Sequence, residues 1–576
     1  MADLDAPSSC INQFPASLSL VDVGASDVTG TNANEYQTMT TESEKEIESP
    51  PAAISADSSS QNGIPAWGTA ELPEPKPLQW RNWASFIGPG IVMMGIQIGG
   101  GEWLLGPAVT AKYGGGLMWI ATVAIILQVF YNMECGRYAL YCGEPVFTGF
   151  MRCWPSPMFW VGVMVTLNIS ALVPGLSTHG AAMIASLILD RPPDKNDLWL
   201  VVPLAYACLF GVALPVIIGG KVYNILQWVM TAKIVIVLGF CFGLGITCVS
   251  FENWWNVWSG FAQFGNVPVA DANDKEHLVN GFGHWWNHGD WPIMSSASLI
   301  VVGAFAGYAG GGGLANSTYS NFVRDKGWGM GSQVGAIPSA VGGRNVTLSH
   351  VGKVFAINEE NMKRWKGWWK YILTDQVLVW APGCFVGMAL PALLSLQFVE
   401  FSQISDEQSK VAQAIITADG IRHYGFHPVL AKLLWIAALF TGLMVMLPSQ
   451  MSILDDFSRR WTDAIWSASR RVRKNMKSDQ VKWIYYAILG TYALWSFLCA
   501  FFFSNAPKLM TDFIANFNNL ALGVTAFQLL WINLRLLPKP LRPRWYQIMG
   551  LSLCGCFYLG LAGLVFVFKI VPMFTG

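Results

Sequence analysis

Long apolar stretches alternate with short polar segments from residue 86 to the end of the chain. Most of these stretches hold about 20 residues or more, which lets an α-helix cross a hydrocarbon core of about 30 Å. We count eleven such spans, at 86–112, 116–141, 158–189, 198–218, 222–249, 293–322, 371–396, 430–452, 483–504, 511–535 and 546–570. The pattern predicts an all-α integral membrane protein.

Glycine runs interrupt the first and the sixth of these spans. Each glycine costs a helix about 1 kcal/mol relative to alanine, and lipid cannot satisfy the backbone groups that a break frees. Paired breaks in matching halves of a chain therefore indicate the midplane site of a secondary transporter. The candidate substrate-binding residues at the two breaks are Gly99, Gly100, Gly101, Glu102, Gly307, Tyr308, Gly310, Gly311, Gly312 and Gly313.

The breaks suit two kinds of ligand. Carbonyl groups at the C-terminus of a half-helix coordinate cations, whereas amides at the N-terminus of a half-helix bind anions such as a carboxylate. Close packing of helices through small residues is the alternative explanation of the glycines.

The breaks also divide the chain into two comparable halves. Five spans between about residues 80 and 250 form one repeat, five between about 290 and 535 form the other, and 546–570 is an extra helix. Each repeat begins with a broken helix, as in a LeuT-type inverted repeat. Residues 1–75 are rich in Ser, Thr, Pro and acidic residues, so we expect a disordered tail before a transmembrane domain at 76–576.

Basic residues gather in alternate loops, at 324–370, 459–482 and 535–544. The positive-inside rule places these loops and the N-terminal tail in the cytoplasm. We therefore expect a multi-pass protein of a plasma membrane or a bacterial inner membrane, with the lipid bilayer as the partner of the apolar spans. The basic loops follow the topology, and we expect no nucleic-acid binding.

Composition excludes several other classes of protein. Hydrophobic residues make up 53% of the chain and charged residues only 12%, which is not the composition of a soluble domain. The 11 cysteines are scattered without zinc-ligand spacing, so neither a disulfide framework nor a cofactor is expected. We find no nucleophile elbow, P-loop or metal triad, and we expect no enzyme.

The chain resembles the Nramp family of proton-coupled divalent-metal transporters. The resemblance rests on Gly88-Pro89-Gly90, on the eight-residue spacer to the first break, on Asp375 at the start of span seven and on the eleven-span plan. It covers about residues 80–570. It implies the LeuT fold, alternating access and a substrate site between spans one and six.

The chain departs from the family at the residues that hold metal. The family's first break reads Asp-Pro-Gly-Asn, and its Asp and Asn are metal ligands, but the aligned residues here are Gly99-Gly100-Gly101-Glu102. The family's sixth span carries a Met-Pro-His motif whose thioether favours soft metals. Span six here has Tyr308 and the glycines 310–313 instead, with Asn316 and Ser317 beyond them.

Two ionisable residues are the first candidates for coupling chemistry. Glu102 would lie at the N-terminus of the outer half of span one, where it could bind Mg²⁺ or Mn²⁺ or carry the coupled proton. It could equally be a carboxylate satisfied by the freed amides. Lys233 lies midway along span five, where an ammonium group must pair or titrate.

Other polar residues inside the spans have weaker claims. Glu134 and Arg137 share one helix face, as a structural ion pair or an inner gate for protons. His179 in span three is a bundle histidine or a proton relay. Asn518 and Asn519 in span ten could supply oxygen ligands or link helices. The segment 277–290 carries several Trp residues with His284 and His288, which suggests an interfacial cap or a metal-gathering vestibule.

These features predict a secondary active transporter that works by alternating access and is coupled to protons. The resemblance makes a divalent metal ion the first substrate class, with Mg²⁺ or Mn²⁺ ahead of soft metals because no thioether stands at the breaks. A transporter of amino acids or other small organic solutes is the second hypothesis. A non-transporting membrane sensor or scaffold is the third. The sequence does not indicate an oligomeric state.

Overall fold

The computed structural model describes residues 62–571 except 173–174, 218–220, 271–275, 340–345, 406–407, 409–410 and 504–506. The predicted tail therefore lies mostly outside the described residues. Its last residues, 62–75, pack against the helices, because Ile64 and Leu72 are buried. The short strand β1 (Gly68–Thr69) also pairs in parallel with β4 (Lys353–Val354).

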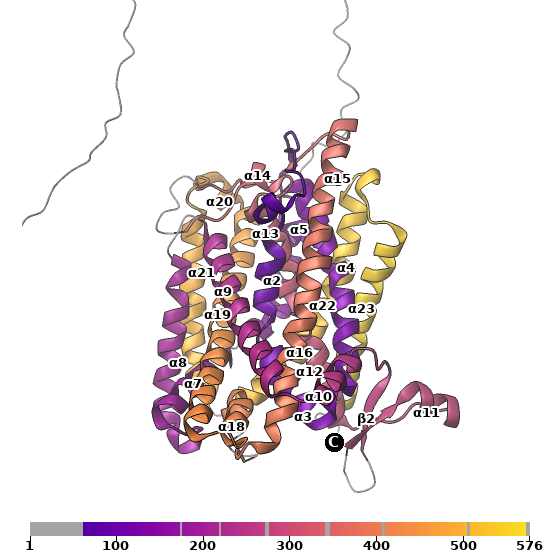
Figure 1. The fold of residues 1–576 in the computed structure, drawn as a ribbon. Helices are drawn as coiled ribbons and strands as arrows, with labels where there is room; N and C mark the ends of the chain where they lie inside the picture. The colour runs from indigo at the N-terminus through magenta and orange to yellow at the C-terminus, as the bar shows by residue number, and fades with distance from the viewer. Residues whose placement is uncertain are drawn as a thin grey trace, which may run out of the picture. The chain divides into compact units, whose positions relative to one another are not determined.

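The described chain is a bundle of apolar helices, as the hydrophobic pattern predicts (Figure 1). Seven helical stretches of the described residues are long and apolar enough to span a membrane by themselves. The first repeat contains α2 (Pro89–Gln97), α3 (Gly106–Tyr113), α4 (Met118–Cys142), α6 (Pro157–Leu167), α7 (Gly175–Leu189), α8 (Leu198–Ala213) and α9 (Val222–Cys248). The predicted third span is thus two helices, α6 and α7, with a 3-10 turn (Ile169–Leu172) between them.

The second repeat follows the same plan. Its helices are α12 (Ser296–Tyr308), α13 (Tyr319–Lys326), α15 (Glu359–Leu373), α16 (Ala381–Phe398), α19 (Pro428–Ala468), α21 (Val481–Phe503) and α22 (Pro507–Leu536), with α23 (Trp545–Val565) as the extra helix. A π-helical segment, Thr374–Trp380, joins α15 to α16 and makes them one long element. Each of the eleven predicted spans therefore contains one or two of these helices.

The packing of the broken helices repeats with inverted direction. The first half of each one packs against the fifth span of its own repeat, α2 against α9 and α12 against α22. The second half of each one packs against the other repeat, α3 against α16 and α13 against α4. In Figure 1, α2 and α13 lie toward one end of the bundle and α3 and α12 toward the other. This exchange is the packing that a LeuT-type inverted repeat requires.

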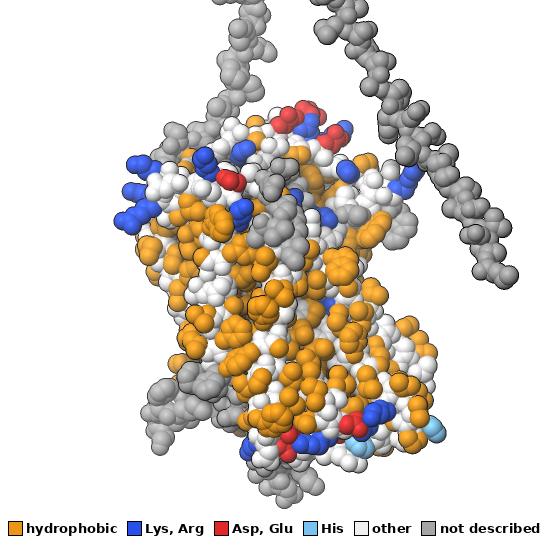
Figure 2. Space-filling view, turned by 90° about the vertical axis from the view of Figure 1, so that its left-hand side faces the viewer, with side chains coloured by type: hydrophobic (Ala, Val, Ile, Leu, Met, Phe, Trp, Pro, Cys, Tyr) orange, Lys and Arg blue, Asp and Glu red, His pale blue; other side chains and the backbone are white. Residues whose placement is uncertain are grey.

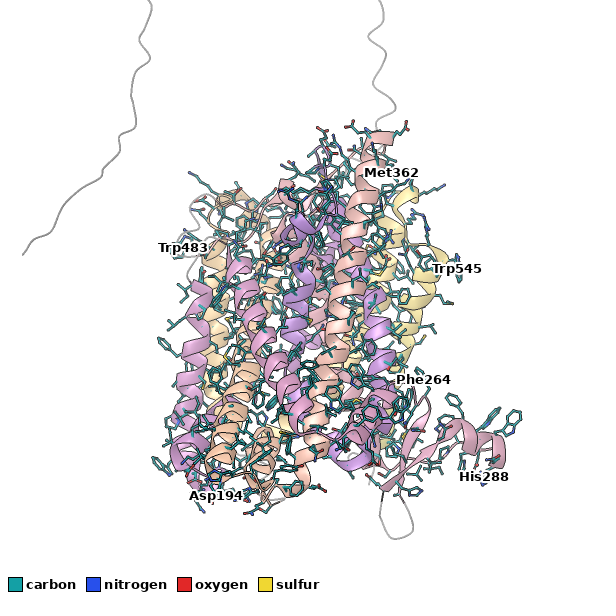
Figure 3. All side chains as sticks on the ribbon, in the orientation of Figure 1. Asp194, Phe264, His288, Met362, Trp483 and Trp545 are labelled. Carbon is teal, nitrogen blue, oxygen red and sulfur yellow. The ribbon has the colours of Figure 1, made fainter. Side chains whose placement is uncertain are left out.

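The loops alternate between the two ends of the bundle. Met362, Trp483 and Trp545 mark one end in Figure 3, and Asp194 marks the opposite one. The first of these ends carries the loops rich in Lys and Arg, and we call it the basic end. Hydrophobic side chains cover most of the flank between the two ends in Figure 2. This flank is the surface that faces lipid.

Short elements complete the described chain. They are α1 (Trp83–Phe86), α5 (Val146–Arg152), α10 (Phe251–Gly260), β2 (Asn266–Ala270), β3 (Glu276–Asn280), α11 (Gly281–His288), α14 (Gly331–Val334), α18 (Ile416–His423) and α20 (Arg470–Asn475). The strands β2 and β3 form an antiparallel hairpin. Together with α11, the hairpin projects sideways from the bundle, with His288 at its far end (Figure 3).

Candidate functional site

The first break lies between α2 and a π-helical turn, Gly101–Leu105. The backbone leaves the helix at Ile98, where ψ is 74°, and Gly100 is helical again. The Gly99 amide donates to Oε2 of Glu102 at 3.0 Å. Glu102 therefore satisfies the amide that its own break frees.

The second break is a run of left-handed backbone. Residues Gly310 to Gly313 have φ values of +87°, +123°, +62° and +62°, which only glycine adopts without strain. Gln128 of α4 binds the peptide groups that this run frees. Its Nε2 donates to the Ala309 carbonyl at 2.7 Å, and its Oε1 accepts from the Gly312 amide at 3.4 Å and from Asn316 at 2.8 Å.

The two breaks lie directly against each other. A Cβ atom on Gly101 would lie 2.6 Å from Cβ of Tyr308. Glycine is therefore needed at 101 for this close approach, because real side chains do not come so near.

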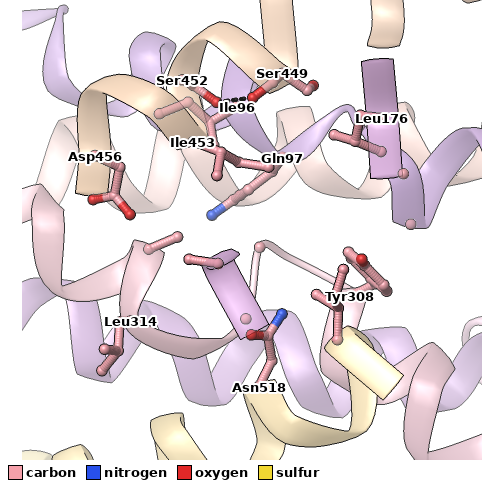
Figure 4. Close-up of a pocket in the computed structure, with 18 of the residues that line it drawn as sticks. Ile96, Gln97, Leu176, Tyr308, Leu314, Ser449, Ser452, Ile453, Asp456 and Asn518 are labelled. Atoms are coloured by element: carbon pink, nitrogen blue, oxygen red, sulfur yellow. Dashed lines mark hydrogen bonds between the residues drawn. The ribbon is translucent and has the colours of Figure 1, made fainter. Parts of the chain in front are cut away.

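A cavity of about 110 Å³ lies between the breaks (Figure 4). Six of the ten predicted site residues line it, and these are Gly99, Gly100, Gly101, Tyr308, Gly311 and Gly312. The other polar residues of the lining are Gln97, Asn168, Ser449, Ser452, Asp456, Arg460 and Asn518. In Figure 4 the side chains of Gln97, Asp456 and Asn518 project into the same space. The volume admits a small solute or several water molecules.

Several buried polar atoms of this lining have no partner within the described part of the chain. They are Nε2 of Gln97, both amide atoms of Asn168, and Nη1 of Arg460. These three residues are 2–4% exposed. A buried polar group without a partner costs about 1–3 kcal/mol, so the lining is prepared for a ligand or for water.

Asp456 and Arg460 form a buried ion pair at one side of the cavity. They are four residues apart on α19, so their side chains share one face of the helix. The Thr318 hydroxyl also donates to Asp456. The cavity therefore has one acidic and one basic group that already neutralise each other.

Glu102 and Lys233 lie behind the lining rather than in it. Both are buried, at 1% and 0% exposure. Lys233 Nζ donates to Oγ of Ser449 at 2.5 Å, and its charge acts on Glu102. Ser449 and Gly99, their direct partners, both line the cavity. A change of charge on this pair would therefore reach the cavity through one intervening residue.

Four of the predicted break residues, Glu102 among them, do not line the cavity. Gly307 packs against the backbone of α22, because an added Cβ would lie 2.1 Å from the Ala515 carbonyl oxygen. Gly310 and Gly313 belong to the left-handed run and shape the lining without forming it.

The pair Glu134–Arg137 lies away from the cavity. Arg137 Nε and Oε2 of Glu134 are 2.9 Å apart. Arg137 also donates to the Leu541 carbonyl and to Gln547, and Asn533 donates to Glu134. These contacts join α4 to α22 and α23, which is the work of a structural ion pair.

The remaining predicted residues are also placed by the structure. His179 is buried in α7, and its two ring nitrogens have no partner in the described chain. Asn518 lines the cavity, whereas Asn519 donates to the Gly303 carbonyl at 2.8 Å. Asp375 accepts from the Tyr319 hydroxyl at 2.8 Å. The rings of His284 and His288 stack at 4.3 Å, and no group of three metal-binding side chains occurs among the described residues.

A buried charge network joins α13 and α19 toward the basic end of the bundle. Arg324 of α13 pairs with Asp463 at 2.6 Å, and Arg459 pairs with Asp455 at 2.9 Å. Asp325 contacts both arginines. Arg324 and Arg459 are predicted to lie in loops, and this prediction is wrong, because α13 and α19 continue through them. The helices extend because each charge is paired inside the protein rather than exposed to water.

The sequence analysis missed Gln97, Gln128, Asn168, Asp456 and Arg460. Gln97, Gln128 and Asn168 each stand alone among apolar residues of a predicted span, and that isolation was an available signal. Asp456 and Arg460 follow the predicted end of span eight at residue 452. Their spacing of four residues indicates an ion pair only if the helix continues, and the sequence does not predict that it does.

The fold is similar to that of the manganese transporter of Eremococcus coleocola. A structure of that protein in complex with an aromatic bis-isothiourea substituted compound has 13% sequence identity and a TM-score of 0.54, covering 89% of this chain and 98% of that chain. A histidine-to-alanine mutant of it has 12% identity and the same TM-score, covering 88% of this chain and 97% of that one. No family model and no curated protein sequence match the chain.

The likeness at this identity concerns the fold. The chain is an all-α membrane protein with the LeuT-type inverted repeat, in which spans one and six are broken and one helix is added. Membership of the Nramp family stays a prediction from the sequence.

Proposed function

We propose that the chain is a secondary transporter that carries a small polar organic solute by alternating access. The proposal is supported above all by the cavity between the two breaks, because several of its buried donors and acceptors lack partners in the described chain. A zwitterion such as a small amino acid would satisfy them. Its carboxylate would accept from Nη1 of Arg460 and Nε2 of Gln97, and its ammonium would donate to Asp456 and Asn168.

A divalent cation is the second candidate, and it is supported by the fold shared with a manganese transporter. Two features of the cavity weigh against it. The carboxylate of Asp456 is already bound by Arg460 and Thr318. The guanidinium of Arg460, which lines the same cavity, would also repel a cation. A metal site would have to use the oxygen atoms of Asn168, Asn518 and backbone carbonyls around Asp456.

We also propose that Glu102 and Lys233 carry the coupling proton. They are buried, close enough to interact, and in contact with two cavity-lining residues, Gly99 and Ser449. Gain or loss of a proton by such a pair changes the charge next to both breaks.

We further propose that the basic end faces the cytoplasm, in agreement with the predicted cytoplasmic position of the N-terminus.

Titration calorimetry of the purified chain tests the substrate class, with an amino-acid panel, MnCl₂ and MgCl₂ as ligands. The main variant is Asn168→Leu, because the Asn168 side chain has no partner to lose among the described residues. We expect it to leave the melting temperature unchanged or higher. We expect it to weaken amino-acid binding about tenfold, as lost hydrogen bonds to a charged ligand do.

The matched control is Asn287→Leu on α11, an exposed side chain outside the lining of the cavity. Manganese binding that is lost in Asp456→Asn, with no amino-acid signal, would favour the second candidate. No binding and no flux with any ligand would favour a sensor or scaffold.

A further inference from the structure

A groove of about 460 Å³ opens on the flank of the bundle near its basic end. Its walls are the start of α6 and the end of α19, with Asn62 and Gly63 at its edge. The walls of the groove include the apolar side chains of Met158, Val161 and Ile465. Met158 is 74% exposed and Ile465 is 37% exposed. The groove therefore presents an apolar surface to the lipid and not to the interior of the bundle.

Positive charge collects at the mouth of this groove. Arg470 lines it, and α20 continues with Arg471, Arg473 and Lys474. Among the described residues, no carboxylate lies within 4 Å of Arg470, Arg471 or Lys474. Burial lowers the pKa of Arg473, and the nearby Arg470 and Arg152 lower it further. Such crowding of like charges is relieved by an anion.

The groove also holds a hydrogen-bond donor. Trp461 lines it, and the indole Nε1 is buried with no partner in the described chain. A buried tryptophan N–H normally finds an acceptor. The groove thus combines apolar walls, a buried indole donor and a cationic rim, with Arg470 nearest the basic end.

We propose that this groove binds an anionic phospholipid. One acyl chain lies along Met158, Val161 and Ile465, and Arg470 binds the phosphate. Trp461 lies one helical turn before Ile465 on α19, on the side away from Arg470, where its ring packs against the acyl chain. Both walls end at the basic end, where α6 begins and α19 stops, so the phosphate would stand at headgroup level. The site is separate from the central cavity and does not depend on the proposed substrate.

Native mass spectrometry of the full chain in detergent tests this site. The probes are phosphatidylglycerol and phosphatidylcholine with identical acyl chains. We expect phosphatidylglycerol to be retained preferentially, and Arg470→Gln to weaken its binding about fivefold, the effect of one basic residue at a membrane surface. Ile465→Trp, which fills the groove from its exposed side, should reduce binding without loss of the folded protein.

The control is Lys539→Gln, which removes one exposed positive charge from the basic end outside the groove. Equal binding of phosphatidylglycerol to Arg470→Gln and Lys539→Gln would overturn the proposal. Equal retention of the two lipids by the unmodified chain would overturn it as well. Displacement of the lipid by millimolar inorganic phosphate would show that the site takes a free anion instead.

Discussion

The two broken helices solve the same problem by different means. At the first break the backbone departs from the helix at Ile98 and recovers by Gly100, and an acidic side chain of the same segment, Glu102, binds the freed amide. At the second break four glycines run in left-handed conformations, and a neutral side chain from another helix, Gln128, binds the freed groups.

This difference separates two requirements of a membrane transporter. The second break is held in shape by neighbours, so its geometry depends on glycine and on packing. The first break is satisfied by a charge that can change with protonation, so its state depends on chemistry. We therefore expect substitutions in the second break to act on folding and substitutions in the first to act on transport.

The largest expected effect is that of Gly312→Ala. A Cβ there would lie 1.8 Å from the Gly307 carbonyl oxygen, and the φ of +62° is strained for alanine. We expect loss of the folded protein in size-exclusion chromatography. Gly100→Ala is the matched variant in the first break, where φ is −62° and the nearest atom is the end of the Leu176 side chain at 3.1 Å. Similar melting temperatures for the two variants would contradict the comparison.

Glu102→Gln should abolish transport while leaving the fold intact. The glutamine oxygen still accepts from the Gly99 amide, but the side chain no longer exchanges a proton. Uptake into proteoliposomes should lose its response to an imposed pH gradient, while calorimetry still detects the substrate. The exposed Glu400→Gln is the control. A variant at residue 102 that keeps its full response to the gradient would exclude Glu102 as the carrier of the proton.

The same contrast explains what the sequence could predict. The glycine runs can be recognised in the sequence because they interrupt two apolar spans at matching places, and they predict the inverted repeat and six of the residues that line the cavity. The side chains that bind the freed groups of the breaks cannot be predicted from the sequence, because they come from distant parts of the chain. Gln128, for example, donates to the Ala309 carbonyl, 181 residues further along the sequence. Arg460 lies beyond the predicted end of span eight and so falls in a predicted loop. Only the folded bundle shows that α19 continues through Arg460 and that Asp456 pairs with it there.

A change at Gln128 should have an intermediate effect. Gln128→Leu leaves the Ala309 carbonyl and the Gly312 amide without a buried partner, which costs about 1–3 kcal/mol. We expect a lower melting temperature but a folded protein. Gln376→Leu is a useful comparison, since that buried amide accepts from Asn132 and does not reach the break. If both variants lose the same stability, Gln128 is an ordinary buried amide and not the specific support of the second break.

The smallest expected effect concerns Glu276, which joins the halves of the two broken helices that lie away from the basic end, α3 and α12. Its carboxylate accepts from Lys112 and Tyr113 at the end of α3, and from Ser298 in α12 at 2.7 Å.

Burial alone would raise the pKa of Glu276, but these hydrogen bonds lower it to about 2, below the ordinary 4.5. The ionised form therefore stabilises the folded protein above pH 4.5, and the gain is lost as pH falls toward 2. Because Lys112 is 56% exposed, we expect the ionised carboxylate of Glu276 to stabilise the folded protein by about 1 kcal/mol. Melting curves should separate Glu276→Gln from the unmodified chain at pH 7 and bring them together as pH falls from 4.5 toward 2, with the exposed Glu252→Gln unchanged throughout. A constant difference at every pH would mean that the contact acts through packing and not through charge.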